Sequence, residues 1–344
     1  MNVARQVWAL RRDVAGALVY WSGLGRAFER LKSPEGAIIL MYHSVAADAE
    51  AKYVDPRNRI SPALFEKQMA FLSRHRRVVA LSDLVNWISE AATPPSGTVC
   101  ITFDDGYLDN FTIAAPILEK YRLPATVFLA TGYIERCETQ WADLLHWMFQ
   151  CRTRDELTLP EIGLPGTNLR TRRGRISARN TIHPRLLEAK YDARASLLQE
   201  IEEQLRPAGS PPRLTLSWDE VRALQRRYPF FEIGGHTRFH IDLRTHIGDT
   251  ARSQISDCAE DLWRELGVRP GHFSFPYSRW CQETRGIVRD MGWQSAVGMG
   301  DAVRITGQSE RYAMPRVEAP RNMTLLRFRT SGAYPGSLSM LRCA

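Results

Sequence analysis

The sequence predicts an α/β fold, a parallel β/α barrel of about seven strands with a helical insertion. Short apolar runs alternate with helical patterns along most of the 344 residues. Most of these runs are followed by a helical pattern, as in β/α units. The rhythm breaks once, between about residues 137 and 213, and then resumes. A doubly wound parallel sheet, which shows the same alternation, is the alternative.

The predicted strands are short apolar runs bounded by turn residues. They lie at residues 37–41, 78–81, 98–103, 125–130, 230–234, 272–275, 295–297 and 312–317. The predicted helices have apolar residues on one face, and Ser61, Ser82 and Ser217 stand at three of their starts as typical N-caps. These helices lie at residues 61–74, 82–89, 108–121, 218–226, 249–266 and 282–291.

The break in the rhythm predicts an insertion at about 137–213. It has no clean strand pattern, but two helical patterns, at 141–149 and 184–204, flank a loop rich in Gly, Pro and Arg. Such a segment is typical of an insertion carried on one loop of a barrel. We therefore expect an N-terminal helical segment at 1–35 and a main domain at 36–335 that contains this insertion.

Composition narrows the class of protein. Lys and Arg (46) exceed Asp and Glu (38) by only eight, without a long basic run, so nucleic acid is not an expected partner. The uncharged stretch 14–25 is shorter than the roughly 20 apolar residues of a membrane span, and it lacks a signal-peptide cleavage pattern. Six scattered cysteines without a CxxC pair indicate reduced thiols. We expect a cytoplasmic protein without stable membrane insertion, and a peripheral position at the inner membrane is the alternative.

Two adjacent carboxylates follow the most strand-like segment. Asp104 and Asp105 come directly after residues 98–103, and Gly106 permits a sharp turn there. Because active sites of β/α barrels lie at the carboxyl ends of the strands, this pair is a candidate site. Adjacent residues leaving a strand point in different directions, so one carboxylate can bind a metal ion while the other acts as a base.

A histidine pair follows a second strand. His236 and His240 stand after residues 230–234 with the spacing H-x-x-x-H, which on one helical turn brings two imidazoles close enough to share a metal ion. Two histidines and one carboxylate leave open coordination positions, as a catalytic metal site requires. A third block, residues 273–278, is a strand that runs into a Pro-containing turn and would aim the backbone N–H of Tyr277 at a reaction centre.

These three blocks, in this order, resemble the signatures of the polysaccharide deacetylase family, the NodB-homology domain of carbohydrate esterase family four. They read TFDDG at 102–106, HTRFH at 236–240 and FSFPYS at 273–278. Residues 42–45 (YHSV) also resemble the YHxV start of one branch, whose members often belong to bacterial glycan biosynthesis. The resemblance covers roughly residues 36–320 and implies a distorted β/α barrel as the catalytic domain.

The resemblance also implies a mechanism. A divalent metal ion, with Zn²⁺ favoured, would be held by Asp105, His236 and His240. Asp104 would be the general base, so that a metal-bound water attacks the amide carbonyl. The backbone N–H of Tyr277 would stabilise the oxyanion that forms.

The chain departs from the family pattern at two roles. The arginines that commonly precede Pro-Tyr are replaced by Gly271 and Ser274, and Arg316 on a late strand is the candidate that supplies this charge. The late histidine that protonates the leaving amine is absent, since no histidine follows His272. His43 beside the first strand, or else His272, is left as the candidate acid.

The leading hypothesis is therefore a metal-dependent hydrolase that removes acetyl groups, N-acetyl favoured, from a saccharide in bacterial exopolysaccharide or glycoconjugate biosynthesis. An acetylated glycan or a lipid-linked saccharide would be the substrate. The alternatives are an amidohydrolase acting on a non-sugar amide and, given the two departures, a catalytically impaired glycan-binding protein.

Overall fold

The computed structural model describes residues 35–267, 269, 271–298 and 303–331. The expected N-terminal helical segment and Cys343 lie outside these residues. The five other cysteines are free thiols. No helix within the described ranges is both long and apolar enough to cross a membrane.

Seven parallel strands close into a barrel, as the alternation of strands and helices predicts. The ring closes because β1 pairs with β12 on one side and with β5 on the other. In order around the barrel the strands are β1 (Ala37–Tyr42), β12 (Met314–Glu318), β11 (Ser295–Gly298), β10 (His272–Ser274), β9 (Phe231–Gly235), β6 (Ala125–Leu129) and β5 (Thr98–Phe103). A short strand, β4 (Arg77–Val78), pairs with the start of β5.

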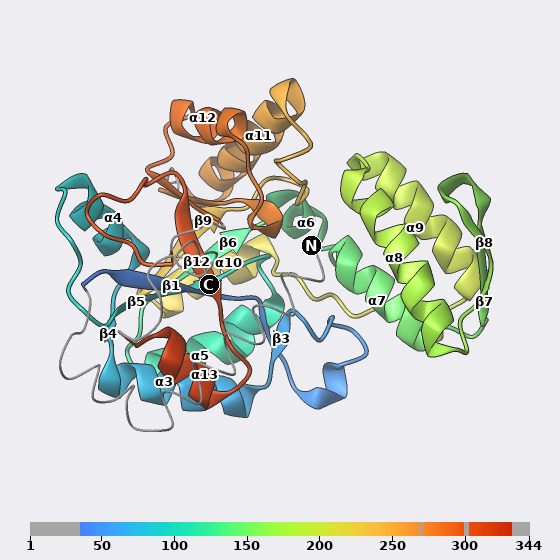
Figure 1. Cartoon of the computed structure of the whole chain (residues 1–344), viewed down its shortest axis with the longest axis horizontal. Coiled ribbons are helices and arrows are strands. Elements are labelled where there is room, and N and C mark those ends of the chain that lie inside the picture. Colours follow the sequence, from blue (N-terminus) through green and yellow to red (C-terminus); the bar gives the residue numbers. More distant parts are fainter. Residues whose placement is uncertain (1–34, 268, 270, 299–302, 332–344) are drawn as a thin grey trace, which may run out of the picture.

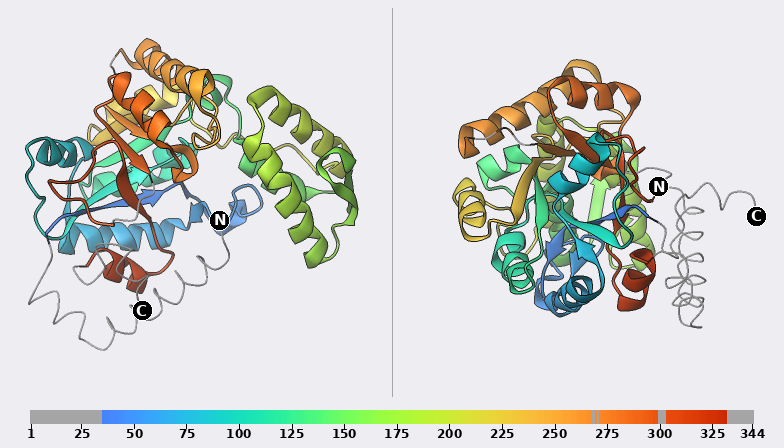
Figure 2. Two further views of the ribbon diagram at one scale, coloured as in Figure 1. Left: turned by 45° about the horizontal axis from the view of Figure 1, so that its top comes forward. Right: turned by 90° about the vertical axis from the view of Figure 1, so that its left-hand side faces the viewer.

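Helices surround the strands on the outside of the barrel (Figures 1 and 2). They cover strands whose residues are buried on both faces, which is why these strands read as continuous apolar runs. The helices of the barrel are α3 (Pro62–His75), α4 (Leu81–Ser89), α5 (Ala115–Lys120), α6 (Thr131–Arg136), α10 (Trp218–Arg227), α11 (Gly248–Leu266), α12 (Gln282–Asp290) and α13 (Met323–Arg329). A π-helical turn, Asn110–Ala114, leads into α5.

The predicted caps of two helices are present and that of a third is not. The Ser61 side chain accepts a hydrogen bond from Leu64 N, and Ser217 forms a capping box with Glu220. Ser82 does not cap α4, which begins one residue earlier. The first N–H groups of α4 instead donate to the Glu232 carboxylate of β9, a partner about 150 residues away in sequence that local reading does not reveal.

The insertion forms a separate lobe beside the barrel (Figures 1 and 2). It has its own hydrophobic cluster, built around side chains such as Trp147, Ile182 and Ile201. Its elements are α7 (Trp141–Cys151), β7 (Glu156–Leu159), β8 (Leu164–Asn168), α8 (Arg172–Glu188) and α9 (Tyr191–Leu205).

Three expectations for the insertion are wrong. It does contain strands, because β7 and β8 pair as an antiparallel hairpin that buries Leu157, Leu159 and Leu164. The arginine-rich stretch is not a loop throughout, since Thr171 caps the start of α8 by accepting from Gly174 N. The single helix expected at 184–204 is two helices that meet at Ala189–Lys190, with Pro184 inside the first.

Candidate active site

The Asp104–Asp105 pair lies at the carboxyl end of β5, inside the rim of the barrel. Both aspartates are buried. Asp105 and Gly106 take left-handed backbone angles (φ 76° and 68°), and this turn sends the two carboxylates in different directions. A Cβ at position 106 would lie 2.7 Å from Leu129 Cδ2, at the end of a side chain that can shift, so the positive φ angle is the main reason for glycine here.

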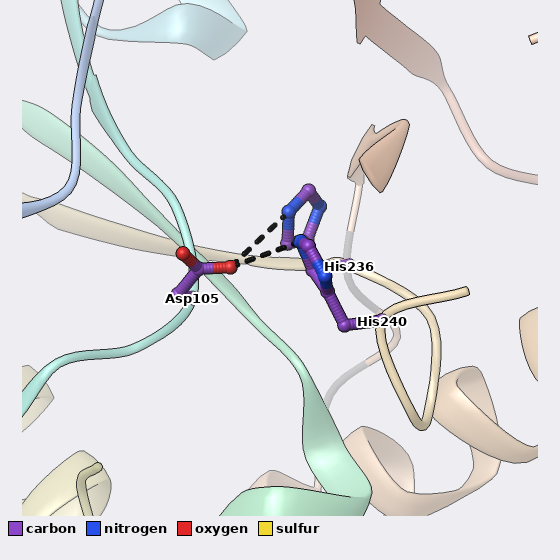
Figure 3. A group of neighbouring side chains, drawn as sticks. All are labelled: Asp105, His236 and His240. Atoms are coloured by element: carbon purple, nitrogen blue, oxygen red, sulfur yellow. Dashed lines mark ion pairs between the residues drawn. The ribbon is translucent and has the colours of Figure 1, made fainter. Parts of the chain in front are cut away.

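Asp105, His236 and His240 converge on one point (Figure 3). The Asp105 Oδ1 atom lies 3.2 Å from His240 Nε2 and 3.6 Å from His236 Nε2. The two imidazole rings have centroids 4.9 Å apart. All three residues are buried, and their ligand atoms lie within 4.8 Å of one another, as sharing one metal ion requires.

The histidine pair is not on a helical turn, contrary to the sequence prediction. Residues 236–240 form an irregular loop after β9, in which Thr237 and His240 have positive φ angles (62° and 49°). The H-x-x-x-H spacing still brings the rings together, because the loop folds back over the strand end. Left-handed angles at non-glycine residues cost about 1–3 kcal/mol each and persist where the surroundings enforce them.

The protonation of the triad suits a divalent cation. His236 Nδ1 lies 2.7 Å from the Ser274 carbonyl oxygen, to which it donates, so Nε2 is free as a ligand atom. Burial lowers the pKa of His236 and, together with the neighbouring His236 ring, lowers that of His240 further. Both imidazoles are therefore neutral at pH 7. The buried Asp105 Oδ1 has no hydrogen-bond partner among the described residues, and a cation would satisfy it.

The electrostatics of the two aspartates differ sharply. Burial raises the pKa of Asp105, and the charge of Asp104 raises it further, an effect that a bound cation would oppose. Burial would also raise the pKa of Asp104, but the Arg316 guanidinium holds it well below its usual range. Asp104 is thus ionised at every ordinary pH.

Arg316 is the partner of Asp104. It donates from Nη1 to Oδ1 (2.7 Å) and from Nη2 to Oδ2 (2.6 Å), a bidentate pair with both side chains buried. Ser274, where the family pattern commonly has an arginine, accepts from Arg316 Nη2 at 2.8 Å and donates to Asp104 at 3.3 Å. The guanidinium that pairs with Asp104 therefore comes from Arg316 on the late strand β12, and not from residues 273–278.

Of the two candidate acids, His43 lies at the site and His272 does not. His43 follows β1 at the same end of the barrel, where the charges of Asp104 and Arg316 act on its ring. Burial lowers its pKa, and the charge of Asp104 opposes that shift. His272 is not at the site. It is the first residue of β10, and its Nδ1 lies 2.9 Å from Ser295 Oγ.

The Tyr277 turn lies against the histidine loop. Tyr277 and Ser278 have positive φ angles of 56° and 54°, the Tyr277 ring lies 4.4 Å from the His240 ring, and its hydroxyl donates to the His240 carbonyl at 3.3 Å. The same hydroxyl accepts from Trp141 Nε1 at 3.0 Å. The side chain thus anchors the turn against the histidine loop and the insertion.

Sequence reasoning missed the residues that the insertion brings to the site. Gln140 Nε2 donates to the Asp105 carbonyl at 3.3 Å. Asp143 accepts a 2.5 Å hydrogen bond from Tyr107 OH, and burial raises its pKa to about 6. No motif spacing marks these residues, because their partners lie 35 or more residues away.

The fold and the site define a β/α-barrel protein with a candidate Asp/His/His metal centre, and comparison with known proteins identifies its family. The model of the polysaccharide deacetylase family matches residues 91–296, so the chain belongs to this family. It is 31% identical over 104 residues to the putative polysaccharide deacetylase YxkH of Bacillus subtilis. It is 33% identical over 76 residues to a poly-β-1,6-N-acetyl-D-glucosamine N-deacetylase of Staphylococcus aureus.

These matches are partial in length. They span 30% of this chain and 35% of the Bacillus protein, and 22% of this chain and 26% of the Staphylococcus protein. The structure of the Streptococcus pyogenes deacetylase PplD in complex with acetate superposes with a TM-score of 0.55 at 17% identity. That superposition covers 85% of this chain and 96% of PplD. At this identity the likeness shows a common fold.

Proposed function

We propose that this chain is a metal-dependent hydrolase that removes acetyl groups, N-acetyl favoured, from a saccharide during bacterial exopolysaccharide or glycoconjugate assembly. The observation that carries the proposal is the juxtaposition of an Asp105–His236–His240 triad with a second, arginine-paired aspartate. In this arrangement Asp105 would bind the metal ion, and Asp104 would be left to act as the base. Family membership and the activity named for the Staphylococcus relative support an acetylated polysaccharide as substrate.

Asp105, His236 and His240 would hold the ion, with Zn²⁺ favoured by the nitrogen and oxygen donor set. The ion would supply Lewis-acid polarisation of the acetyl carbonyl and of the attacking water. His236 reaches it through Nε2, since Nδ1 is engaged by the Ser274 carbonyl. Asp105 contributes Oδ1, the oxygen that has no other partner in the described structure.

The remaining residues would move protons and orient the substrate. Asp104 accepts the proton of the attacking water, and Arg316 fixes both of its oxygens so that this carboxylate stays ionised and oriented. The Tyr277 N–H donates to the developing oxyanion. His43 is the candidate that would give a proton to the leaving amine: burial lowers its pKa, but the charge of Asp104 opposes that shift and favours the protonated ring.

The test is release of free amine and acetate from defined substrates. The panel contains β-1,6- and β-1,4-linked N-acetylglucosamine oligomers, a lipid-linked acetylated saccharide and a simple non-sugar acetanilide. We expect turnover of at least one saccharide, and a loss of about 10²–10⁴-fold in Asp104→Asn. Asp109→Asn, a nearby aspartate bonded to Ser44 and Val45, is the matched control and should retain activity. Turnover of acetanilide alone would favour the non-sugar amidohydrolase, and glycan binding without turnover would favour an impaired enzyme.

A further inference from the structure

The insertion contacts three segments of the candidate site. Gln140 binds the carbonyl of Asp105, and Trp141 binds the hydroxyl of Tyr277. The third contact comes from α9, where Arg194 Nη1 donates to the carbonyl oxygen of Phe239 at 3.2 Å. Phe239 directly precedes His240, so Arg194 contacts the peptide bond that joins Phe239 to a candidate metal ligand.

Arg194, on α9, is a buried arginine whose hydrogen bonds go to uncharged acceptors. It is 1% exposed, and no ion pair joins it to a carboxylate among the described residues. Its donors go to uncharged acceptors instead. Nε binds the Leu186 carbonyl (2.9 Å), Nη2 binds that of Ala189 (3.2 Å), and the guanidinium lies over the Trp141 ring, 5.3 Å from its centroid. A buried cation held this way satisfies the open carbonyls at the end of α8.

The loop that Arg194 reaches needs external support. Thr237 and His240 both have left-handed backbone angles. Such angles are unfavourable at non-glycine residues and persist where contacts enforce them. Several barrel residues also hold the loop, among them Thr131, whose N–H donates to the Thr237 carbonyl at 3.3 Å, and Tyr277, whose hydroxyl donates to the His240 carbonyl. Gly132 N donates to the Arg238 carbonyl at 2.8 Å, and Gln254 Oε1 accepts from Phe239 N at 2.8 Å. Arg194 supplies the contact to the Phe239 carbonyl, on the peptide that joins Phe239 to His240.

We propose that Arg194 is a positioning residue for His240, through which the insertion holds the histidine loop in its metal-binding conformation. The role rests on the proposed function, because it assumes that His240 is a ligand. The guanidinium joins the end of α8 to the loop with rigid, forked donors. A lysine, with one flexible ammonium group, cannot donate to the Leu186, Ala189 and Phe239 carbonyls with the same geometry. The insertion is thus part of the metal centre's support.

The test compares Arg194→Lys with Arg152→Lys. Arg152 is the matched control because it also bridges main-chain carbonyls and a side chain, but all of its partners (Phe149, Asp155 and Leu169) lie within the insertion. Zinc affinity is measured by competition with a chromophoric chelator. The Co²⁺ absorption spectrum reports ligand geometry, and thermal unfolding of the metal-free proteins reports stability.

We expect Arg194→Lys to weaken zinc binding about 10–100-fold and to change the Co²⁺ spectrum, whereas Arg152→Lys leaves both as in the wild type. Lower metal-free stability in Arg194→Lys with wild-type zinc affinity would overturn the proposal, because it would show a purely structural role. If Arg194→Lys does not fold, Arg194→Gln, which keeps a shorter neutral donor at the same position, takes its place, and wild-type zinc affinity with a wild-type Co²⁺ spectrum there would also overturn the proposal. A wild-type chain that binds no zinc or cobalt would instead refute the proposed function itself.

Discussion

The barrel and the insertion contribute to the candidate site in different ways. The barrel supplies the chemical groups from the carboxyl ends of its strands, where Asp105 follows β5, His236 follows β9 and Arg316 lies on β12. The insertion supplies contacts that orient these groups, from Gln140, Trp141 and Arg194. The comparison teaches that a site's reactive groups can come from one unit of a chain while much of their support comes from another.

The largest expected effect breaks the barrel's contribution at Arg316. Arg316→Met leaves the buried Asp104 carboxylate without its counter-charge, which we expect to cost about 3–5 kcal/mol of unfolding free energy. Without the guanidinium, burial raises the pKa of Asp104. The carboxylate then ionises only at higher pH, so the acidic limb of kcat/KM should move upward and activity should recover as pH rises.

Arg213→Met is the control for that pH profile. Arg213 pairs with Glu220 at the start of α10, so the variant loses an ion pair without touching Asp104. Its profile should match the wild type. An unmoved acidic limb in Arg316→Met would show that Arg316 does not set the ionisation of Asp104.

A second prediction asks whether the insertion and the barrel unfold together. Ile182→Ala creates a cavity in the core of the insertion, and Ile101→Ala creates one in the core of the barrel. Both isoleucines are almost fully buried. Each should cost about 2–5 kcal/mol. If the contacts to the site couple the two units, urea unfolding followed by far-UV circular dichroism should show one shifted transition in both variants. A separate, earlier transition in Ile182→Ala alone would contradict this coupling.

A smaller effect is expected at Asp109, which supports the barrel rim outside the triad. Burial raises the pKa of Asp109 to about 7, although hydrogen bonds from Ser44 and Val45 oppose that shift. Its protonated form is therefore favoured in the folded state, and this stabilisation is present below the unfolded pKa of about 3.9 and lost as pH rises toward 7.

Asp109→Asn mimics the protonated carboxyl at every pH. The variant should therefore gain stability over the wild type as pH rises from 4 to 7, on the order of 2 kcal/mol at the upper end. Urea unfolding at a series of pH values measures the difference. A difference that stays constant with pH would show that Asp109 titrates normally.

Local sequence predicts much of the barrel and of its site. The run 98–103 predicts β5 to the residue, and the TFDDG and H-x-x-x-H blocks place three side chains that do converge. Buried parallel strands are continuous apolar runs, and a site at their carboxyl ends follows from topology. The conformation of the histidine loop did not follow, because positive φ at Thr237 and His240 is enforced by residues from other elements.

What the sequence could not predict depends on contacts between distant residues. Glu232 caps α4 across about 150 residues, and Arg194 reaches Phe239 across 45. In the insertion, β7 alternates in burial, but β8 contains Pro165 and Gly166 and has no alternation that would mark it as a strand. Such features appear only once the chain is folded.

The most direct test of the central claim is the metal content of the purified protein, measured by elemental analysis together with acetate release. Both are compared between the wild type and the double variant His236→Ala/His240→Ala. We expect near-stoichiometric divalent metal in the wild type, with metal and acetate release lost together in the double variant. A wild-type protein that binds no divalent metal, even after Zn²⁺ is added, would contradict the assignment of this site.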